Sequence, residues 1–366
     1  MHVILVFTYG ISLKNWDEAG ILDREVAIYK KMNEDNNIHF SFVTFGDKED
    51  ENYSDLIDNL KVVPIYKYIE KSNNKLLNFI KTIIGTKTIL KQINDPTFIK
   101  TNQLNGSWVA MVMKYHLKLP LYIRTGYNLF EFSIRDKKSV LKKSFYYFLT
   151  QWALLYSDYY SVTSSSDKIF LSKYFLTKKI LVIPNWVKDI KKNSFENRFK
   201  DKILSIGRLE VQKNFNSLIE SLSNSDIEID IIGEGSQKES LKSLAKSNNV
   251  MLNLSGNKEH TELNKLYLNY KIFVLPSTFE GNPKVVLEAM SRGALVVARS
   301  NKNIIEIVKD NQNGIIYKSN AELLDKLIYF LNNKEDWKRI TSNAYKTIEE
   351  KNIIDIVIKK ELDLYG

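Results

Sequence analysis

The chain has 366 residues, of which 44% are hydrophobic, so it is long enough for two globular domains with cores of their own. Its 53 lysines and arginines outnumber its 43 aspartates and glutamates, which gives a formal net charge of +10. The absence of cysteine excludes disulfides, thiolate metal sites and cysteine nucleophiles, and the four histidines are scattered, so we predict no metal site.

No run approaches the roughly 18 uncharged apolar residues of a membrane-spanning helix, and the first residues, MHVILVFTYG, are typical of a strand rather than a signal peptide. We therefore expect a cytoplasmic protein. The positive charge indicates an anionic partner such as a nucleotide, a lipid surface or nucleic acid, or else reflects a base-composition bias in the encoding genome. The sign of the charge alone does not choose between these.

The N-terminal half alternates short apolar strands with longer helices. The expected elements are, in chain order, 2–8, 20–32, 38–44, 60–66, 76–93, 98–101, 107–117, 121–124, 140–156, 159–163, 167–174 and 180–183. This alternation predicts an α/β fold with a doubly wound parallel sheet.

Ligands of such sheets bind at the carboxyl ends of the strands, where three loops of this half begin. The loop 9–19 contains Gly10, the loop 101–106 contains Asn102 and opens a helix, and the loop 124–128 contains Arg124 and Tyr127. Polar loop residues at strand ends are enriched in binding sites, so these four residues are candidates. The alternative that Arg124 and Tyr127 only pack their loop stays open.

The segment 135–156, RDKKSVLKKSFYYFLTQWALLY, has a basic start followed by an aromatic amphipathic helix. Such a helix can lie on an anionic membrane surface. An apolar stripe like Phe145, Phe148, Trp152 and Leu155 more often packs onto a sheet while the lysines stay in solvent. We expect packing, and contact of the lysines with a membrane remains the alternative.

Pro184 and the polar run 188–200 mark a boundary between two domains. The predicted domains are 1–184 and 201–345, joined by a linker at 185–200. The second domain has expected strands at 202–206, 227–232, 250–254, 272–275, 295–297 and 314–317, and expected helices at 261–270, 283–292, 303–310 and 321–332, before a helical tail at 335–364. Gly233 and Gly235 form a turn at which the backbone can approach a phosphate or a sugar.

Two carboxylates, Glu280 and Glu288, lie in one strand-loop-helix segment, TFEGNPKVVLEAMSRG at 278–293. Pro283 suits the first position of a helix and Gly293 its C-terminal cap. Glu280 then precedes the helix and Glu288 lies about a turn and a half inside it, so both can face a ligand over the helix N-terminus, which favours anions. Taken alone, the pair is also consistent with a first-turn acid and a solvated helix residue.

The Glu-x7-Glu pattern within F-E-G-x-x-x-V-x-L-E-A-M, with G-R-L-x-x-x-K-N at 207–214 and I-P-N-W-V at 183–187, resembles retaining glycosyltransferases of the GT-B fold. These belong to family four, glycosyl transferases group 1, and make surface polysaccharides and glycolipids. The resemblance implies two Rossmann-like domains facing each other across a cleft, the first binding an acceptor and the second a nucleotide sugar. It also implies that a last helix, 346–366, crosses back to the first domain.

The resemblance assigns roles residue by residue. Arg208 and Lys213 would stabilise the negative charge that collects on the leaving diphosphate, Glu280 would contact the donor sugar, and Glu288 would bind the ribose hydroxyls. The remaining donor contacts would come from Gly207, Gly233, Gly235, Gly256, Asn257, Gly281, Asn282 and Lys284. Gly10, Asn102, Arg124 and Tyr127 would line the acceptor cleft.

The chain departs from the family at the loop 9–19, which lacks paired glycines, at 124–128, which lacks a histidine, and at Trp186 and Lys188 in the linker. The favoured proposal for retaining members is front-face attack, in which the leaving phosphate oxygen accepts the acceptor's proton. That reaction needs neither a protein base nor a metal or other cofactor.

The partners implied are a nucleotide-sugar donor and a glycan or lipid-linked glycan acceptor, without nucleic acid. A peripheral contact with the inner face of the plasma membrane is the open alternative for localisation. The alternative functions are a nucleotide-sugar epimerase of the same fold and a non-catalytic protein that binds nucleotide sugars or nucleic acid. The chain shows none of the recognised interleaved aromatic-basic motifs of nucleic-acid binding.

Overall fold

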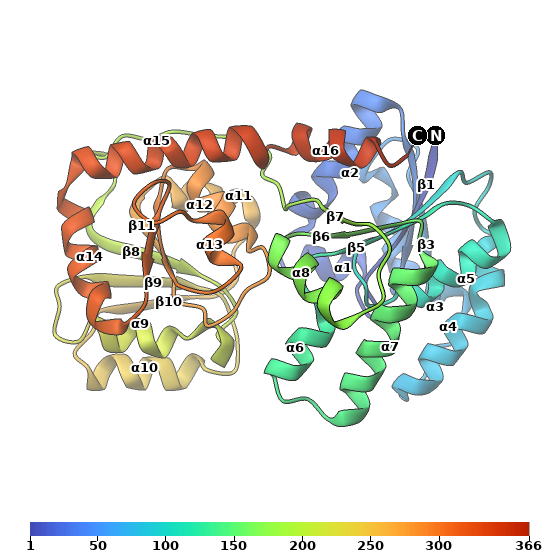
Figure 1. Ribbon diagram of the computed structural model, residues 1–366, viewed down its shortest axis with the longest axis horizontal. Helices are drawn as coiled ribbons and strands as arrows, with labels where there is room; N and C mark the ends of the chain where they lie inside the picture. Colours follow the sequence, from blue (N-terminus) through green and yellow to red (C-terminus); the bar gives the residue numbers. More distant parts are fainter. Residues whose placement is uncertain (366) are drawn as a thin grey trace. The chain divides into compact units, whose positions relative to one another are not determined.

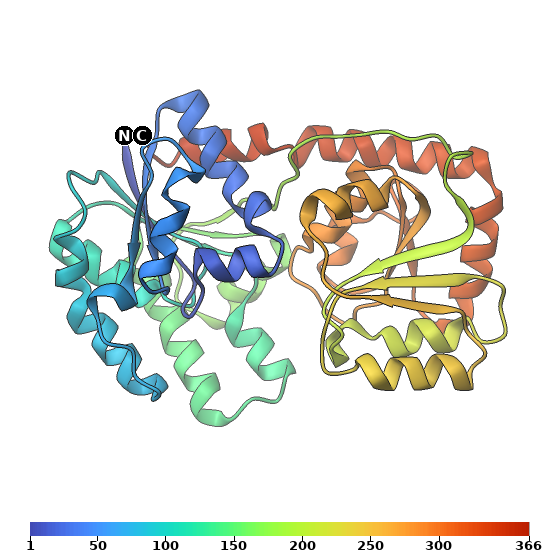
Figure 2. The same ribbon diagram turned by 180° about the vertical axis from the view of Figure 1, so that it is seen from behind.

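The computed structural model describes residues 1–365 and contains two compact units. Unit 1 consists of Met1–Ile183 together with the tail from Ile358, and unit 2 is Pro184–Val357. Figures 1 and 2 show a parallel sheet flanked by helices in each unit, which confirms the predicted α/β fold with two doubly wound domains.

Unit 1 is built on seven parallel strands in the order β3-β2-β1-β4-β5-β6-β7. The strands are β1 (His2–Val6), β2 (His39–Thr44), β3 (Lys61–Pro64), β4 (Phe98–Thr101), β5 (Leu121–Thr125), β6 (Tyr159–Val162) and β7 (Ile180–Val182). The helices are α1 (Leu13–Glu18), α2 (Leu22–Asn36), η1 (Lys48–Leu56), α3 (Ile65–Tyr68), α4 (Lys75–Leu90), α5 (Ser107–Leu117), α6 (Leu129–Arg135), α7 (Val140–Tyr156) and α8 (Ser165–Tyr174).

Four short helices of unit 1 were not expected from the sequence: α1, η1, α3 and α6. Their short lengths leave little apolar periodicity to detect. Helix α1 is held at its start by Ser12 and by the buried Asp50, whose carboxylate accepts the backbone N–H groups of Leu13 and Lys14 at 3.1 Å each. Helices of this size depend on such caps more than on helix propensity.

The tail of the chain packs on the sheet of unit 1. Helix α16 (Ile354–Leu362) brings Glu361 to Lys100 of β4, where the two form a fully buried ion pair. Phe98 of the same strand contacts Tyr365, with ring centroids 4.7 Å apart. Phe98 and Lys100 point to the same face of the sheet because side chains alternate along a strand.

The expected packing of the aromatic stripe of α7 is wrong. Phe148 and Trp152 are 68% and 63% exposed, and Phe145 and Leu155 are 39% and 41% exposed. The buried residues of this helix are Leu149, Thr150, Ala153 and Leu154. The sequence is apolar on both sides of α7, so its pattern does not say which side packs, and the structure packs the less aromatic one.

Unit 2 has six parallel strands in the order β10-β9-β8-β11-β12-β13. The strands are β8 (Phe199–Ile206), β9 (Glu228–Ile232), β10 (Leu252–Ser255), β11 (Tyr270–Leu275), β12 (Leu295–Arg299) and β13 (Ile315–Tyr317). The helices are η2 (Val211–Lys213), α9 (Phe215–Ser221), α10 (Lys238–Ser247), α11 (His260–Tyr267), α12 (Lys284–Ser291), α13 (Ile304–Ile307), α14 (Asn320–Asn332) and α15 (Lys334–Lys351).

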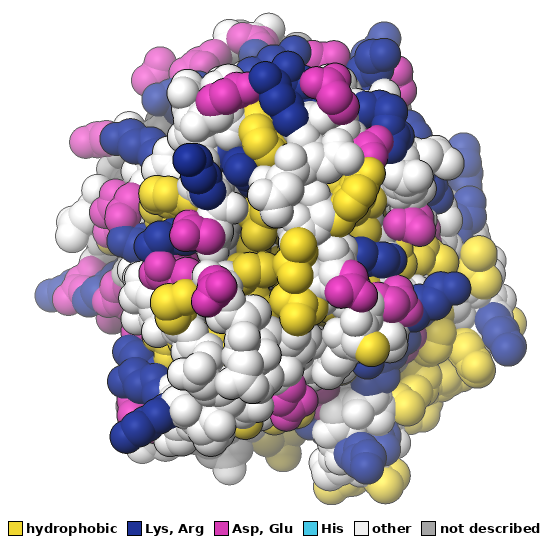
Figure 3. All heavy atoms as spheres, turned by 90° about the vertical axis from the view of Figure 1, so that its left-hand side faces the viewer, with side chains coloured by type: hydrophobic (Ala, Val, Ile, Leu, Met, Phe, Trp, Pro, Cys, Tyr) yellow, Lys and Arg dark blue, Asp and Glu magenta, His cyan; other side chains and the backbone are white. Residues whose placement is uncertain are grey.

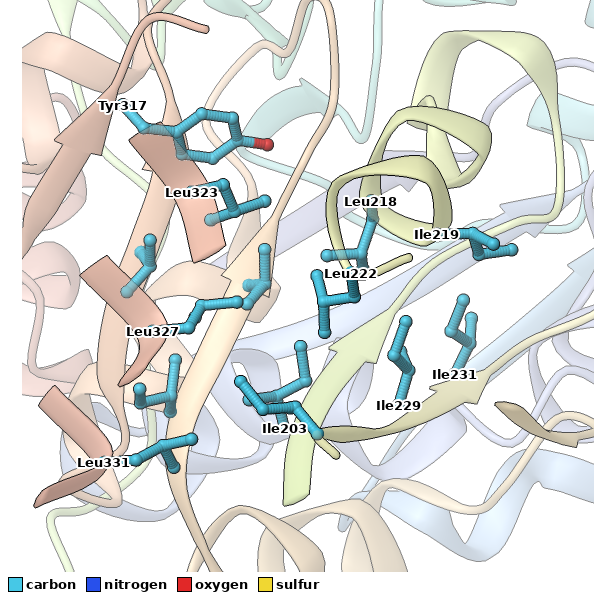
Figure 4. Close-up of a cluster of buried hydrophobic side chains, with 14 of the residues drawn as sticks. Ile203, Leu218, Ile219, Leu222, Ile229, Ile231, Tyr317, Leu323, Leu327 and Leu331 are labelled. Atoms are coloured by element: carbon cyan, nitrogen blue, oxygen red, sulfur yellow. The ribbon is translucent and has the colours of Figure 1, made fainter. Parts of the chain in front are cut away.

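Alternation along the strands of unit 2 produces two cores, one on each face of the sheet. Figure 4 shows part of the first, in which Ile203, Ile229 and Ile231 meet side chains of α9 and α14. The neighbouring positions Leu204 and Ile232 point to the other face, toward α11, α12 and α15. Burial on both faces accounts for strands that are apolar throughout.

The structure departs from the sequence-based elements of unit 2 at several places. Helices η2, α9 and α10 were not expected, β8 begins at Phe199 within the predicted linker 185–200, and α13 covers only 304–307 of the predicted 303–310. The predicted helical tail is interrupted between α15 and α16. At that point the backbone of Val187 donates to Asn352 O at 2.8 Å and accepts from Ile354 N at 3.0 Å, which replaces helical hydrogen bonds.

No helix formed by residues 1–365 combines the length and the apolar character needed to cross a membrane. On the face that Figure 3 shows, basic, acidic and apolar side chains are interspersed. The excess positive charge of the chain therefore forms no broad single-sign patch on that face, unlike the basic footprint of a nucleic-acid binding protein.

Candidate functional site

The order of the strands singles out one edge of unit 2. The connections from β8 run toward β9 and β10, whereas those from β11 run toward β12 and β13, so the direction of winding reverses between the adjacent strands β8 and β11. In open parallel sheets the ligand crevice lies beyond the carboxyl ends of the strands at such a reversal. The loops 207–214 and 276–283 leave β8 and β11 at this point.

An ion pair joins these two loops. The ammonium of Lys213 lies 2.6 Å from a carboxylate oxygen of Glu280, and their side chains are only 14% and 9% exposed. The backbones are also tied, because Thr278 N donates to Gln212 O at 3.0 Å and the side-chain amide of Gln212 donates to Phe279 O at 2.9 Å. Both charged groups are therefore held in place before any ligand binds. We call this site, where the winding reverses between β8 and β11, the crossover.

Two predicted site glycines have a structural reason to be glycine. Gly233 has φ 145°, and a Cβ there would lie 2.1 Å from the carbonyl oxygen of Gly207. A Cβ on Gly235 would lie 2.5 Å from the carbonyl oxygen of Leu209. The loops after β8 and β9 thus touch backbone to backbone, and at Gly207 the stem of Lys213 passes 3.1 Å from where a Cβ would be.

Glu288 is buried within α12, with 3% of its surface exposed, so it is not the solvated helix residue that the isolated pair also allowed. The hydroxyl of Tyr267 donates to one of its carboxylate oxygens at 3.2 Å. The Nε2 atom of His260 lies 3.3 Å from the other oxygen. A carboxylate held by two partners at a fixed depth suits a binding role, because its orientation is set before a ligand arrives.

His260 and Tyr267 are site residues that the sequence analysis missed. Both belong to α11, where His260 is the first residue and Tyr267 the last. The histidine had been set aside as one of four scattered copies. Its position at the start of a helix next to the strand that precedes Glu280 was the available signal.

The start of α12 is supported by residues from other segments. Asn185 donates to the carbonyl oxygen of Asn282 at 2.5 Å, and Asn303 donates to that of Glu280 at 2.8 Å. The ammonium of Lys284 lies 5.2 Å from the ring centroid of Trp186. Trp186, noted above as a departure from the family, is buried and braces the helix from the linker side.

The remaining donor-site candidates lie around this crossover. Arg208 is exposed on the loop after β8, two residues before Glu210, whose carboxylate accepts hydrogen bonds from the backbone and hydroxyl of Ser236 at 3.1 and 2.9 Å. Gly256 and Asn257 follow β10, and a Cβ on Gly256 would lie 2.8 Å from a carboxylate oxygen of Glu234. Gly281 directly follows Glu280. The cations Arg208, Lys213 and Lys284 make this edge suitable for a phosphate-bearing ligand.

In unit 1 the winding reverses between β1 and β4, and the candidates Gly10 and Asn102 lie on the loops that leave these strands. Gly10 has φ 77°, and the space around its missing Cβ is open. The two loops are tied where Tyr9 N donates to Asn105 O at 2.9 Å. Both residues lie where a ligand of unit 1 would be expected.

The other two candidates of unit 1 differ in their surroundings. Arg124 is 9% exposed, and its Nε atom lies 4.0 Å from Glu361, so its side chain belongs to the buried cluster around the Lys100–Glu361 pair. Tyr127 is 37% exposed and contacts Phe132 with ring centroids 5.4 Å apart. Arg124 therefore packs in the interior, as the alternative to an acceptor role proposed, whereas Tyr127 is accessible to a ligand.

Within residues 1–365 no group of three or more histidine, aspartate or glutamate side chains is placed to hold a metal ion. An open hollow of about 590 Å³ lies elsewhere on unit 2, lined by residues such as Lys309, Asp310, Glu322 and Lys326. Its charged groups are used internally, since Lys326 donates to Ile316 O at 2.7 Å and Asp310 accepts from Ile316 N at 2.8 Å. None of its lining residues is a site candidate, and we assign it no role.

Two Rossmann-like parallel-sheet units in one chain are the architecture of the GT-B class of glycosyltransferases. The charged crossover of unit 2, with its fixed carboxylates and cations, is consistent with the nucleotide-sugar domain of that class.

Comparison with known proteins gives the family. Residues 187–347 match the family described as glycosyl transferases group 1. The chain is a glycosyltransferase, and its second unit belongs to this family. The chain is also similar to a Campylobacter jejuni enzyme, with 25% identity over 319 residues that cover 84% of this chain and 85% of that protein. That enzyme is named GalNAc-alpha-(1->4)-GalNAc-alpha-(1->3)-diNAcBac-PP-undecaprenol alpha-1,4-N-acetyl-D-galactosaminyltransferase.

Similarity to solved structures extends over the whole chain. The crystal structure of HepE from Anabaena in complex with UDP and glucose has a TM-score of 0.76 at 15% identity, covering 100% of this chain and 99% of that one. The sucrose-phosphate synthase of Thermosynechococcus elongatus has a TM-score of 0.82 at 13% identity, covering 100% of this chain and 98% of that one. At these identities the likeness shows the fold.

Proposed function

We propose that this glycosyltransferase moves a sugar from a nucleotide diphosphate sugar to a hydroxyl of a glycan or lipid-linked glycan, with retention of the anomeric configuration and without a metal. The observation that carries this proposal is the Lys213–Glu280 pair, fixed at the β8–β11 crossover beside α12 and its buried Glu288.

The cations of the crossover account for departure of the nucleotide. When the bond between the anomeric carbon and the diphosphate breaks, negative charge collects on the leaving oxygen. Lys213 and Arg208 lie on the loop after β8 and stabilise that charge without a metal. The ammonium of Lys213 has three N–H donors, so it can keep its bond to Glu280 while it donates to a phosphate oxygen.

The carboxylates account for positioning of the donor. Glu288 is held by Tyr267 and His260 and binds the ribose hydroxyls, which are donors that suit an ionised acceptor. Glu280 binds a hydroxyl of the donor sugar. In the front-face reaction the acceptor oxygen bonds to the anomeric carbon on the face that the diphosphate leaves, and the acceptor proton passes to the leaving phosphate oxygen, so no protein base is needed.

Uridine diphosphate is the first donor nucleotide to test. Its support is indirect: the similar HepE structure holds UDP and glucose, and the Campylobacter relative is named for transfer of N-acetylgalactosamine to a glycan on undecaprenyl diphosphate. An acceptor carried on a polyprenyl diphosphate would require this enzyme to act at the inner face of the plasma membrane. Its role would then be in bacterial surface polysaccharide biosynthesis.

The first experiment is thermal unfolding with UDP, GDP, ADP, TDP and CMP in turn, in the presence of EDTA. A nucleotide that binds only the folded protein raises the unfolding midpoint by mass action, and we expect one diphosphate to do so selectively. Product configuration by NMR then tests retention. An inverted product, or turnover abolished by EDTA and restored by a divalent cation, would overturn those parts of the proposal.

The matched variants are Glu280→Gln and Arg208→Ala, which remove a charge at the crossover. Both should lower turnover by a factor on the order of 100 or more. The unfolding midpoint should stay near that of the wild type for the exposed Arg208, and should fall by a few degrees for Glu280→Gln, which leaves the partly buried Lys213 without its counter-charge. Glu210→Gln, on the same loop as Arg208, is the control and should keep most of the activity. Near-normal turnover of the first two variants would contradict the assignment.

A further inference from the structure

Helices α4 and α7 form an outer layer of unit 1. Both pack on α5, and α5 in turn packs on the strands β1, β4 and β5. Figures 1 and 2 show the two helices on the same side of the sheet, opposite to α2 and α16. The faces of α4 and α7 that point away from α5 are therefore turned to solvent.

The outer face of α7 is apolar along its length. Leu141, Phe145, Phe148, Trp152 and Leu155 recur at helical spacing and are 85%, 39%, 68%, 63% and 41% exposed. This stripe has the pattern of a core-facing helix side, yet the structure leaves it uncovered.

Helix α4 buries polar side chains and exposes apolar ones, the opposite of an ordinary surface helix. Its buried positions include the polar Asn78, Thr82 and Thr86, whereas its exposed ones include the apolar residues Leu76 (65%), Leu77 (47%), Ile80 (42%) and Ile84 (72%). The buried polar groups are satisfied: Thr82 accepts from the indole N–H of Trp108 at 3.1 Å, and Asn78 accepts from Ser72 N at 2.6 Å. Such an arrangement is unfavourable for a helix that has only water outside it.

The two helices touch beside α5. Phe79 of α4 contacts Phe145 of α7 with ring centroids 5.8 Å apart, and both rings contact Trp108 of α5. We call the exposed apolar residues of the two neighbouring helices the α4–α7 surface; it consists of Leu76, Leu77, Ile80, Ile84, Leu141, Phe145, Phe148, Trp152 and Leu155. Large exposed apolar areas mark interaction sites rather than ordinary protein surface.

The charges around this surface are mostly positive, although Lys81 pairs with Glu70 at 3.1 Å and Lys138 with Asp136 at 3.5 Å. Neither helix contains an aspartate or a glutamate, while Lys75, Lys81 and Lys87 belong to α4, and Lys142 and Lys143 to α7. Lys137 and Lys138 are exposed just ahead of α7. Leucine and aromatic side chains bordered by lysines are the composition of helices that lie in the interface of an anionic membrane.

We propose that the α4–α7 surface docks unit 1 on an anionic lipid bilayer, with Phe148 and Trp152 inserted at the level of the headgroups and the lysines on the lipid phosphates. A second copy of the chain fits less well, because each copy would bring the same excess of lysines to the contact. The inference extends the membrane part of the proposed function. Vesicle binding is measured without donor or acceptor, so either proposal can fail alone.

The test is flotation of the full chain with vesicles of phosphatidylcholine and phosphatidylglycerol in about equal parts, compared with phosphatidylcholine alone. We expect flotation with the anionic vesicles and a loss with rising salt. The double variants Phe148→Ser/Trp152→Ser and Ile80→Ser/Ile84→Ser should each lower vesicle affinity at least about tenfold, as should Lys137→Gln/Lys142→Gln.

The matched control is Ile305→Ser/Ile328→Ser, since these residues are 47% and 48% exposed on unit 2. It should float like the wild type, and all variants should keep the wild-type unfolding midpoint. Failure of the wild type to float, or an equal loss in the control, would overturn the proposal. So would a concentration-dependent dimer that the α4 and α7 variants convert to monomer while vesicle affinity is unchanged, because the surface would then join two copies.

Discussion

At the scale of single residues, the site is defined by carboxylates with partners. A buried carboxylate such as Glu288 is costly unless its oxygens are paired, and here Tyr267 and His260 take one oxygen each. Glu280 is paired with Lys213 in the same way. These pairs keep the two acids oriented in the protein without ligand, so donor binding need not organise them.

Replacing His260 by alanine should raise the KM for the donor about tenfold with a smaller change in kcat, because Glu288 loses its contact with the imidazole but stays in place. Steady-state kinetics with varied donor concentration provide the measurement. Asn264→Ala is the control, since Asn264 contacts the His260 ring, with its amide nitrogen 3.3 Å from Nδ1 and 3.5 Å from Nε2. Equal effects on kcat and on KM in both variants would show that the histidine only supports the fold.

Lys213 and Glu280 should act as one unit in catalysis. We expect Lys213→Met and Glu280→Gln each to lower kcat by a factor on the order of 100, and the double variant to lose little more than the worse single variant. A double-mutant cycle on kcat measures this coupling. Independent, multiplying losses would mean that the 2.6 Å pair does not persist when the donor is bound.

At the scale of elements, the segment that leads into unit 2 is tied down along its length. Arg198 is buried and donates to the carbonyl oxygens of Tyr270 and Arg292 at 2.8 and 2.7 Å. Glu196 pairs with Lys334 at the start of α15. Polar segments between domains are often mobile, but these contacts make this one part of unit 2.

The Glu196–Lys334 pair implies a pH dependence. The hydrogen bond from Lys334 lowers the pKa of the Glu196 carboxyl from 4.5 to about 2. Because the folded-state pKa is depressed, the stabilisation is fully present above pH 4.5 and is lost as the pH falls toward 2. The unfolding midpoint of Glu196→Gln should lie about a degree below that of the wild type at pH 6, and the two should converge near pH 2.

Salt provides the control for this comparison. Both partners are about half exposed, at 43% for Lys334 and 53% for Glu196, so the difference at pH 6 should shrink in high salt. A difference that is independent of pH and salt would assign the effect to packing of the side chain instead.

At the scale of the whole molecule, the last residues of the chain complete the first unit. The carboxylate of Glu361 lies beside Lys100 and Arg124 in the interior, beneath Tyr29 and Tyr122. Burial lowers the pKa of the Lys100 ammonium, and the Glu361 carboxylate opposes that shift. The core of unit 1 is therefore completed only when Glu361 has joined it.

Glu361→Gln should lower the unfolding midpoint of unit 1 by roughly 10 °C, because it leaves buried cations without their counter-charge, at a cost of about 3–5 kcal/mol. The double variant Lys100→Met/Glu361→Met should recover most of this loss, since it removes the charges together. Calorimetry resolves the two units if they unfold separately. A double variant no better than the single one would show that packing, not charge, holds the tail.

Much of the fold could be predicted from local pattern. Short apolar runs between longer helical stretches indicated both parallel sheets, and the GT-B class followed from the Glu-x7-Glu segment with Arg208 and Lys213. The roles of these residues stay predictions. The short helices could not be predicted, because they depend on caps such as Asp50 from distant parts of the chain. The packed side of α7 could not be predicted either, because both faces of that helix are apolar.

The sequence by itself therefore determined the class of fold and the segments from which the site is built, because apolar periodicity and motif spacing are properties of residues close together in the chain. Only the tertiary structure decided that His260 and Tyr267 meet Glu288, that Glu361 returns to Lys100, and that α4 turns its apolar side outward. Each of these depends on contacts between segments distant in sequence, whose relative positions follow from packing the whole chain and not from any local pattern.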